Sequence, residues 1–516
     1  MVFDLEVPVA DIDRRVFGSF VEHMGRSVYQ GIYEPGSPYA DEDGLRTDVV
    51  ELVRELGVTS VRYPGGNFLS GYDWKDGIGP ADERPVRLDL AWHSLETNRF
   101  GVDEFMAWCD KVGVEPMMAA NLGTGTLTSA LELLEYCTVD AGSHHAQLRR
   151  ANGHEQPYRV RTWCLGNEMD GPWQIGHLSA DEYGRKAAEV ARAMRMIDAD
   201  LQLVACGSSN RTMPTFGAWE HTVLEHTYDQ VDFISLHQYY DPDDDVAAFL
   251  GSGAQLESFI TEVIAVADAV KARRRSTRTV DLSLDEWNVW RMGRYDSRPT
   301  PTTWEQAPRL IEDTYTVTDA VVVGDLLISI LRHADRVRMA CLAQLVNVIA
   351  PIRTEPGAPA WRQTIFHPFA LTSRYARGRA LLTTVRTPQL PAARHGEVPQ
   401  VSAVATHDAT TGEIAVFLVN RSTEAAAQVE LRPRGTTSAV VVREHLAVFD
   451  TDLTATNQQH DPDRVVPRPM PLTAGDTGTG SDTGTGSDTV SDARSEPVLR
   501  VTLPAASWNL VRIGTQ

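Results

Sequence analysis

Lysine is scarce in this 516-residue chain, although basic residues as a class are not. Only four of its 48 basic side chains are lysines, namely Lys75, Lys111, Lys186 and Lys271. None of them ends a strand-like run, where a lysine that forms a Schiff base with a substrate would be expected. The placement of lysine therefore disfavours Schiff-base chemistry of the aldolase kind.

Cysteine is also scarce, and its distribution excludes two classes of protein. The chain has five cysteines, an odd number, with no C-x-x-C pair: Cys109, Cys137, Cys164, Cys206 and Cys341. This pattern favours reduced, buried thiols over a disulfide framework or a zinc site. Reduced thiols predict a cytoplasmic protein. We also expect no metal or other cofactor.

Long hydrophobic segments are missing. The first residues, MVFDLEVPVADIDRR, carry early acidic side chains and lack the apolar stretch of a signal peptide. The most apolar helical pattern, at 321–331, contains Asp325 and is too short to span a bilayer. These features predict a protein that does not enter a membrane.

Acidic residues outnumber basic ones by 70 to 48, so the formal net charge is −22. So acidic a surface disfavours nucleic acids and anionic membranes as partners, whereas an uncharged substrate such as a sugar is compatible with it. The chain is too long for one ordinary core and predicts one large domain with a smaller one.

Strand-like runs alternate with helical patterns up to about residue 350. The runs are 17–24, 60–66, 115–123, 160–168, 201–209, 231–240, 280–287 and 338–347. Several are apolar at consecutive positions, as parallel strands buried on both faces should be. The alternation predicts an α/β fold, a (β/α)₈ (TIM) barrel over residues 17–384, with a doubly wound open sheet as the alternative.

The pattern changes in residues 385–516, where apolar and polar residues alternate without a long helix between them. This alternation predicts an antiparallel β-sandwich of the jelly-roll type. Residues 1–16 are expected to add a strand to it. The tract at 475–492 repeats DTGTGS and cannot bury apolar area, which predicts a disordered loop with no catalytic role.

Polar side chains recur where the predicted barrel strands end, and in such barrels the active site forms there. The polar residues at these ends are Glu22, His23, Arg62, Asn67, Asn121, Asn167, Glu168, His237, Tyr239, Glu286, Gln344 and Asn347. They are expected to line a cleft for a hydroxyl-rich ligand. Tryptophans that could offer flat faces to sugar rings are Trp74, Trp92, Trp163, Trp173, Trp287 and Trp290.

Glu168 and Glu286 carry the chemical hypothesis, since two carboxyl groups are the minimal equipment for cleaving a glycosidic bond. One must donate a proton to the leaving oxygen while the other stays ionised. A separation of about 5 Å would retain the anomeric configuration, and one of about 6.5–9.5 Å would invert it.

Other interpretations of the same residues remain open. A single glutamate at a strand end is more often salt-bridged than catalytic, and Arg62 fits the role of a neutralising partner. A metal-dependent sugar isomerase would use Glu22, Glu168, His237 and Glu286 as ligands. A non-catalytic carbohydrate-binding protein is a third possibility, which the presence of both glutamates disfavours.

Several long motifs resemble one known family. They are GSFVEHMGRSVYQGIYEPG from Gly18, VRYPGGNFLSGYDWKDGIGP from Val61, AWHSLETNRFG from Ala91, WCLGNEMDGPWQIGH from Trp163, ISLHQYY from Ile234, LDEWNVW from Leu284 and QLVNVIAPI from Gln344. The chain is similar in these motifs to the family 51 glycoside hydrolases, the α-L-arabinofuranosidases of clan A. Another clan-A activity, such as a β-xylosidase or an endoglucanase, is the nearest alternative.

The resemblance implies a retaining double displacement that releases arabinose from the non-reducing end of small oligosaccharides. It implies that Glu168 is the acid/base and Glu286 the nucleophile. It also implies that the sugar is held by Glu22, Asn67, Asn167, Tyr239 and Gln344, with His237 and Trp92 beside them. From its place at a strand end, Arg62 is expected to join these binding residues. An intracellular homo-hexamer without a metal is the expected assembly.

Overall fold

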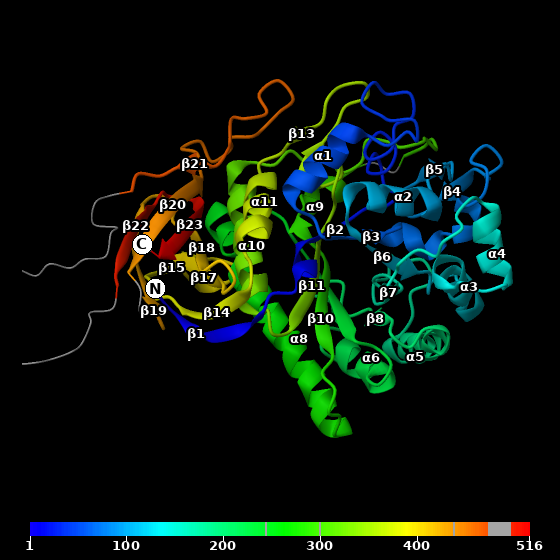
Figure 1. Ribbon diagram of the computed structural model, residues 1–516, viewed down its shortest axis with the longest axis horizontal. Helices are drawn as coiled ribbons and strands as arrows, with labels where there is room; N and C mark the ends of the chain where they lie inside the picture. The colour runs from blue at the N-terminus through cyan, green and yellow to red at the C-terminus, as the bar shows by residue number, and fades with distance from the viewer. Residues whose placement is uncertain (243–244, 299–300, 437–438, 473–496, 516) are drawn as a thin grey trace, which may run out of the picture.

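The computed structural model describes residues 1–242, 245–298, 301–436, 439–472 and 497–515 (Figure 1). Its larger part is a closed barrel of parallel strands. In barrel order, which is also chain order, the strands are β2 (Gly18–Phe20), β3 (Ser60–Tyr63), β6 (Glu115–Ala120), β7 (Thr162–Leu165), β8 (Gln202–Ala205), β9 (Phe233–Tyr240), β10 (Asp281–Val289) and β11 (Val337–Leu342). β11 pairs with β2 through Cys341 and Gly18, which closes the barrel. The (β/α)₈ prediction is confirmed, and the open sheet is excluded.

Helices surround the barrel. They are α1 (Thr47–Leu56), α2 (Val102–Val112), α3 (Leu127–Thr138), α4 (His144–Ala151), α5 (Ala180–Ile197), α6 (Ala218–Thr227), α7 (Val246–Leu250), α8 (Ser252–Arg274), α9 (Met292–Asp296), α10 (Val317–Arg332) and α11 (Phe366–Tyr375). At the start of α5, Ser179 and Glu182 form the expected capping box. Three short 3₁₀ helices are η1 (Arg14–Phe17), η2 (Asn67–Gly71) and η3 (Trp74–Gly77).

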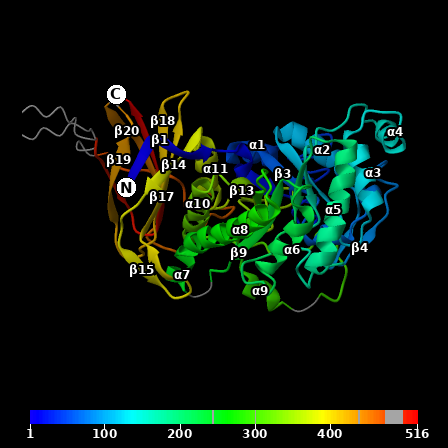
Figure 2. The ribbon, with the colours of Figure 1, turned by 90° about the horizontal axis from the view of Figure 1, so that it is seen from below.

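A nine-stranded, mostly antiparallel sheet lies at one end of the molecule, beyond α10 and α11 (Figures 1 and 2). Its order is β21 (Arg468–Pro469), β20 (Val440–Val448), β23 (Ser507–Thr515), β18 (Glu413–Asn420), β17 (Val401–Asp408), β14 (Arg379–Thr384), β1 (Val2–Asp11), β19 (Ala427–Arg434) and β22 (Leu499–Leu503). The sheet has a hydrophobic core of its own, which includes Phe3, Val416 and Leu499. Two-stranded ribbons are β4 (Arg87–Asp89) with β5 (Ser94–Glu96), β12 (Ile352–Arg353) with β13 (Trp361–Arg362), and β15 (Gln389–Ala392) with β16 (Gly396–Pro399).

The first strand of the chain belongs by pairing to this sheet, because β1 lies between β14 and β19. The domain bounds at residues 16 and 384 stay predictions. They assign β14 to the barrel domain, whereas β14 pairs with β1 and β17. We therefore propose a boundary before Arg379. The DTGTGS tract at 475–492 lies outside the described residues.

Helix α10 joins the two parts of the molecule. It contacts α8 and α11 on one side and β17, β18 and β23 on the other. Asp325, which interrupts its apolar sequence, is fully buried and accepts hydrogen bonds at 2.7 and 3.0 Å from Arg421, just after β18. The charge in this apolar helix thus has a partner in the nine-stranded sheet. Within the described residues, no helix is long and apolar enough to cross a membrane.

Removal of the Arg421 charge should destabilise the protein. Arg421→Ala leaves the Asp325 carboxylate buried without its cation, so we expect the free energy of unfolding to fall by about 3–5 kcal/mol, measured by urea denaturation. Arg185→Ala is the matched control, because it breaks the exposed pair of Arg185 with Asp181 on α5. The control should lose less than about 1 kcal/mol. An Arg421→Ala loss no larger than that of the control would contradict a structural role for the buried pair.

Candidate active site

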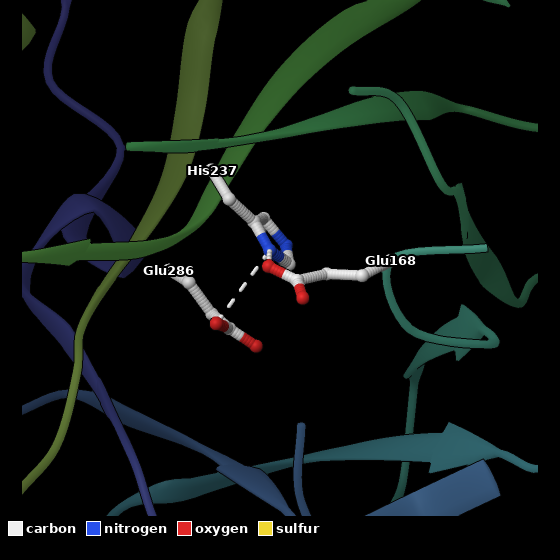
Figure 3. Close-up of side chains that lie close together, drawn as sticks. All are labelled: Glu168, His237 and Glu286. Atoms are coloured by element: carbon white, nitrogen blue, oxygen red, sulfur yellow. Dashed lines mark hydrogen bonds and ion pairs between the residues drawn. The ribbon is translucent and has the colours of Figure 1, made fainter. Parts of the chain in front are cut away.

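The two predicted catalytic glutamates and the eight residues predicted to surround the sugar gather at one end of the barrel. Nine lie on or shortly after β2, β3, β7, β9, β10 and β11, and Trp92 lies in the turn between β4 and β5. All are buried except Asn67, Trp92 and Tyr239, which are partly exposed. Figure 3 shows Glu168, His237 and Glu286 pointing toward one another from separate segments. The strand ends therefore place these polar groups in one site.

Glu286 is held on both carboxylate oxygens. Arg62 donates to Oε1 at 2.7 Å, and the Tyr239 hydroxyl donates to Oε2 at 2.9 Å. Arg62 also donates to Oδ1 of Asn167 at 2.7 Å, and Nδ2 of Asn167 points to Oδ1 of Asn67 at 3.4 Å. Burial raises the pKa of Glu286, while the positive charges of His237 and Arg62 oppose that rise. These bonds fix the orientation of the Glu286 carboxylate.

Glu168 stands in a different environment. Its Oε2 accepts a hydrogen bond from Nε1 of Trp173 at 2.7 Å, and its Oε1 lies 3.0 Å from Nδ1 of His237. The backbone of Glu168 has φ = +42°, a left-handed conformation that is unfavourable for a residue with a side chain. Such strain persists where the surroundings enforce it, and it is common at functional sites.

A second group of hydrogen bonds surrounds Glu22. Its Oε1 accepts from Nε1 of Trp92 at 2.8 Å and from the backbone of Phe68 at 2.9 Å, and Gln344 donates to Oε2 at 3.2 Å. Burial and the nearby charge of Glu286 raise the pKa of Glu22 to about 8. The raised pKa favours the neutral form of Glu22, which can both donate and accept hydrogen bonds.

His237 lies between the carboxyl groups. Its Nδ1 is 3.0 Å from Glu168 and 3.5 Å from Glu286, and its Nε2 is 3.0 Å from Oδ1 of Asp285. Burial disfavours a charged imidazole, but the surrounding carboxylates outweigh burial and hold the pKa of His237 well above its ordinary value.

Asp285 is a site residue that the sequence reasoning missed. In a regular strand, consecutive side chains point to opposite faces, so only one of Asp285 and Glu286 would face the site. The pairing of β10 with β9 shifts between Ser283 and Glu286, where β10 carries one extra residue. This β-bulge lets both carboxyl groups reach His237. Two acidic residues in succession on a buried strand were the available signal.

The tryptophan prediction was wrong in part. Trp163 and Trp287 are fully buried, and Trp74 packs against Tyr136 in the core. These three cannot offer a face to a sugar. Trp173 is 48% exposed while bonded to Glu168, and Trp92 and Trp290 are partly exposed.

Three other strand-end residues use their polar groups in hydrogen bonds within the protein. The Asn121 carboxamide accepts hydrogen bonds from Gly123, Thr124 and Gly125 of its own loop. Asn347 donates to the backbone of Arg26 and to Thr354. His23 lies 2.8 Å from Glu96 and 2.7 Å from the Tyr63 hydroxyl, as a hydrogen-bonded core histidine would. Their roles are structural.

The two glutamates are close. Among the described residues, a carboxylate oxygen of Glu168, a ring nitrogen of His237 and a carboxylate oxygen of Glu286 all lie within 4.8 Å of one another. So close an approach of carboxylate oxygens favours a retaining mechanism, in which the carboxyl groups lie about 5–5.5 Å apart, over an inverting one with about 6.5–9.5 Å. Glu22, which the isomerase alternative also requires, lies outside this group and is bonded to Trp92 and Phe68.

Comparisons with known proteins agree with the geometry. Residues 52–247 match the α-L-arabinofuranosidase 1 domain, and residues 285–481 match the α-L-arabinofuranosidase C-terminal domain. A curated intracellular exo-α-(1→5)-L-arabinofuranosidase from Streptomyces lividans is 53% identical over 98% of this chain and 73% of its own length. An exo-α-(1→6)-L-arabinofuranosidase from Bifidobacterium longum is 51% identical over 99% of this chain and 97% of its own length.

Solved structures give the same result. A family 51 α-L-arabinofuranosidase from Bifidobacterium longum superposes with a TM-score of 0.91 at 43% identity, covering 99% of both chains. The arabinose complex of an α-L-arabinofuranosidase from Thermotoga maritima gives a TM-score of 0.84 at 33% identity, with 99% of this chain and 98% of the other covered. With barrel, paired glutamates and full-length similarity in agreement, the chain belongs to glycoside hydrolase family 51, the retaining α-L-arabinofuranosidases of clan A.

Proposed function

We propose that this chain is an exo-acting α-L-arabinofuranosidase in which Glu286 is the nucleophile and Glu168 the acid/base. The observation that carries the proposal is the short separation of two carboxyl groups in unlike environments. Glu286 contacts a guanidinium and a phenol, which stabilise an anion, whereas Glu168 contacts an indole and an imidazole. The guanidinium and phenol on Glu286 support its proposed role in attack, and the resemblance to the family supports proton transfer by Glu168.

In the first half of the reaction, an oxygen of Glu286 attacks the anomeric carbon of the arabinofuranosyl unit. The bond to the leaving oxygen breaks, its electron pair goes to that oxygen, and Glu168 supplies the proton. Arg62 and Tyr239 hold the attacking carboxylate in place until it forms the ester. Orientation of this kind lowers the barrier because the reacting atoms are held together before reaction.

In the second half, Glu168 is ionised and takes a proton from water. The water oxygen attacks the anomeric carbon, the ester bond to Glu286 breaks, and arabinose leaves with its configuration retained. Each carboxyl group returns to its starting form.

We propose that the remaining predicted residues hold the sugar. Glu22, Asn67, Asn167, Tyr239 and Gln344 offer donors and acceptors to its hydroxyls, and Asn167 is assigned to the 2-hydroxyl next to the reacting carbon. A contact there tightens as positive charge develops on the ring. Trp92 orients Glu22 through its indole nitrogen, while Arg62 and His237 act on the two glutamates.

As a glycoside hydrolase, the chain acts on small oligosaccharide substrates. We propose (1→5)-linked arabinofuranose as the preferred linkage, since the names of relatives from Streptomyces lividans and Bacillus subtilis specify it. The same names specify an intracellular enzyme, and we propose that location here. A homo-hexamer stays a prediction, which light scattering of the purified protein would test. Full activity after chelation with EDTA would reject the isomerase alternative.

Loss of the Glu286 carboxylate should abolish turnover. Glu286→Ala leaves no group to form the glycosyl ester, so we expect kcat/KM for p-nitrophenyl α-L-arabinofuranoside to fall by at least about 10⁴-fold. The same assay on the p-nitrophenyl xyloside and glucoside defines the sugar preference of the unaltered enzyme. Retention of more than a hundredth of the activity, in a variant with unchanged thermal unfolding, would remove Glu286 from the proposed role.

Loss of Glu168 should depend on the leaving group. Glu168→Ala should slow cleavage of an arabino-oligosaccharide by about 10²–10⁴-fold, because its alkoxide needs a proton, while nitrophenolate leaves without one. Azide should restore the rate on the nitrophenyl substrate by replacing water in the second half-reaction. Equal losses on both substrates, with no rescue, would argue against acid/base catalysis by Glu168.

A further inference from the structure

A line of buried side chains runs from Asp285 through His237 to Glu168. Both contacts are short: Asp285 Oδ1 and Glu168 Oε1 each lie 3.0 Å from a different nitrogen of His237. Figure 3 shows Glu168 and His237. Asp285 is 1% exposed and does not reach the anomeric position itself, since the imidazole lies between it and Glu168. The contact of Asp285 that leads to Glu168 is therefore the one through His237.

The second oxygen of Asp285 indicates that this residue is ionised. Oδ2 lies 3.7 Å from Nε of Arg62 and 3.5 Å from the Cys164 thiol. Burial would raise the pKa of Asp285, but Arg62 and His237 lower it below its ordinary value. An ionised Asp285 can only accept a hydrogen bond, so Nε2 of His237 carries a proton. The opposite nitrogen, Nδ1, then faces Glu168.

We propose that the proton delivered to the leaving oxygen is shared between Glu168 Oε1 and His237 Nδ1, and that Asp285 is the positioning residue that keeps it there. The proposal rests on the acid/base role proposed for Glu168. Asp285 fixes the imidazole by accepting from Nε2, which aims Nδ1 at the carboxyl group. Its negative charge also stabilises the additional proton on the pair.

The proton count closes over both half-reactions. Before cleavage, Glu168 and His237 hold one shared proton besides the Nε2 proton. Glu168 passes that proton to the leaving oxygen, and Nδ1 of His237 is then free to accept a hydrogen bond. In the second half, water gives a proton back to Glu168 as its oxygen bonds to the anomeric carbon and the ester to Glu286 breaks. The shared proton is then restored.

Charged and titratable groups reach His237 from several elements. Glu168 after β7 and Asp285 and Glu286 on β10 contact it, and Asp170 after β7 acts through space. Arg62 on β3, Cys164 on β7 and Tyr239 on β9 contact its carboxyl partners. Carboxylates outnumber the single guanidinium, and the nearest ones hold the pKa of His237 well above its ordinary value. A neutral residue in place of Asp285 removes one of those charges, so the shared proton should dissociate at a lower pH.

The first test compares pH profiles of kcat/KM on two substrates. For methyl α-L-arabinofuranoside, a poor leaving group, Asp285→Asn should move the alkaline limb to lower pH by about 1–3 units, as expected for removal of a close opposite charge. The alkaline limb for p-nitrophenyl α-L-arabinofuranoside should move much less, because this substrate needs no acid. Titration of Glu22 affects binding of both substrates alike, so the difference between the two profiles isolates the shared proton.

Asp170→Asn is the matched control. Asp170 is a buried carboxyl near Glu168 that accepts hydrogen bonds from the backbone and hydroxyl of Ser209. It influences His237 only through space. Its replacement should shift the alkaline limb less than Asp285→Asn does. An equal shift for both variants, or a uniform loss in Asp285→Asn with unchanged limbs, would overturn the positioning role.

A second test needs no activity. With ¹⁵N-labelled histidine, the ring nitrogens of His237 are assigned among the 15 histidines by the signals lost in His237→Asn. The unaltered protein should show both ring nitrogens of His237 protonated or proton-sharing at pH 7, with Nε2 protonated throughout. An Nε2 without a proton, or a His237 that titrates near pH 6.5, would overturn the proposal. Inactivity on every arabinofuranoside would instead refute the proposed function. The ¹⁵N measurement would then still decide whether Glu168 and His237 share a proton.

Discussion

Glu168 and Glu286 have carboxyl oxygens within 4.8 Å of each other, so the two groups repel when both are charged. The neighbouring residues at this end of the barrel offset that repulsion. Arg62 contacts Glu286 on one side, and His237 lies between Glu286 and Glu168. The positive charges let one carboxylate stay ionised although both groups are buried. Without them, burial alone would favour neutral acids on both sides, and no carboxylate would be ionised for attack.

This arrangement depends on a closed barrel. Arg62 comes from β3, Glu168 follows β7, His237 lies on β9 and Glu286 on β10. Residues so far apart in sequence converge only because the strand ends form a ring. The bulge in β10 adds Asp285 to the group, and rigid strands hold the geometry more closely than loops would. Between the barrel and the nine-stranded sheet, the buried pair of Asp325 and Arg421 ties α10 to that sheet.

The sequence was sufficient for the parts of the structure that follow from periodicity and strand ends. Consecutive apolar runs between amphipathic helices predicted the barrel, and glutamates after two such runs predicted the paired carboxyl groups. Asp285 was missed, because strict alternation turns it away from Glu286 and the bulge arises from pairing with a distant strand. Trp163 and Trp287 were misjudged for a related reason, since sequence does not say which face of a strand meets the helices. Asn121 and Asn347 resemble ligands in sequence, yet they satisfy the backbone of tight loops.

The covalent step is the centre of this account, and the fate of the sugar in a Glu168→Ala enzyme tests it most directly. That variant should form the glycosyl ester with p-nitrophenyl α-L-arabinofuranoside and hydrolyse it slowly, so the intermediate accumulates. Rapid acid quenching, peptic digestion and mass spectrometry should find one pentosyl group on the peptide that contains Glu286. A pentosyl group on a different residue, or a burst of nitrophenol without any labelled peptide, would contradict the mechanism.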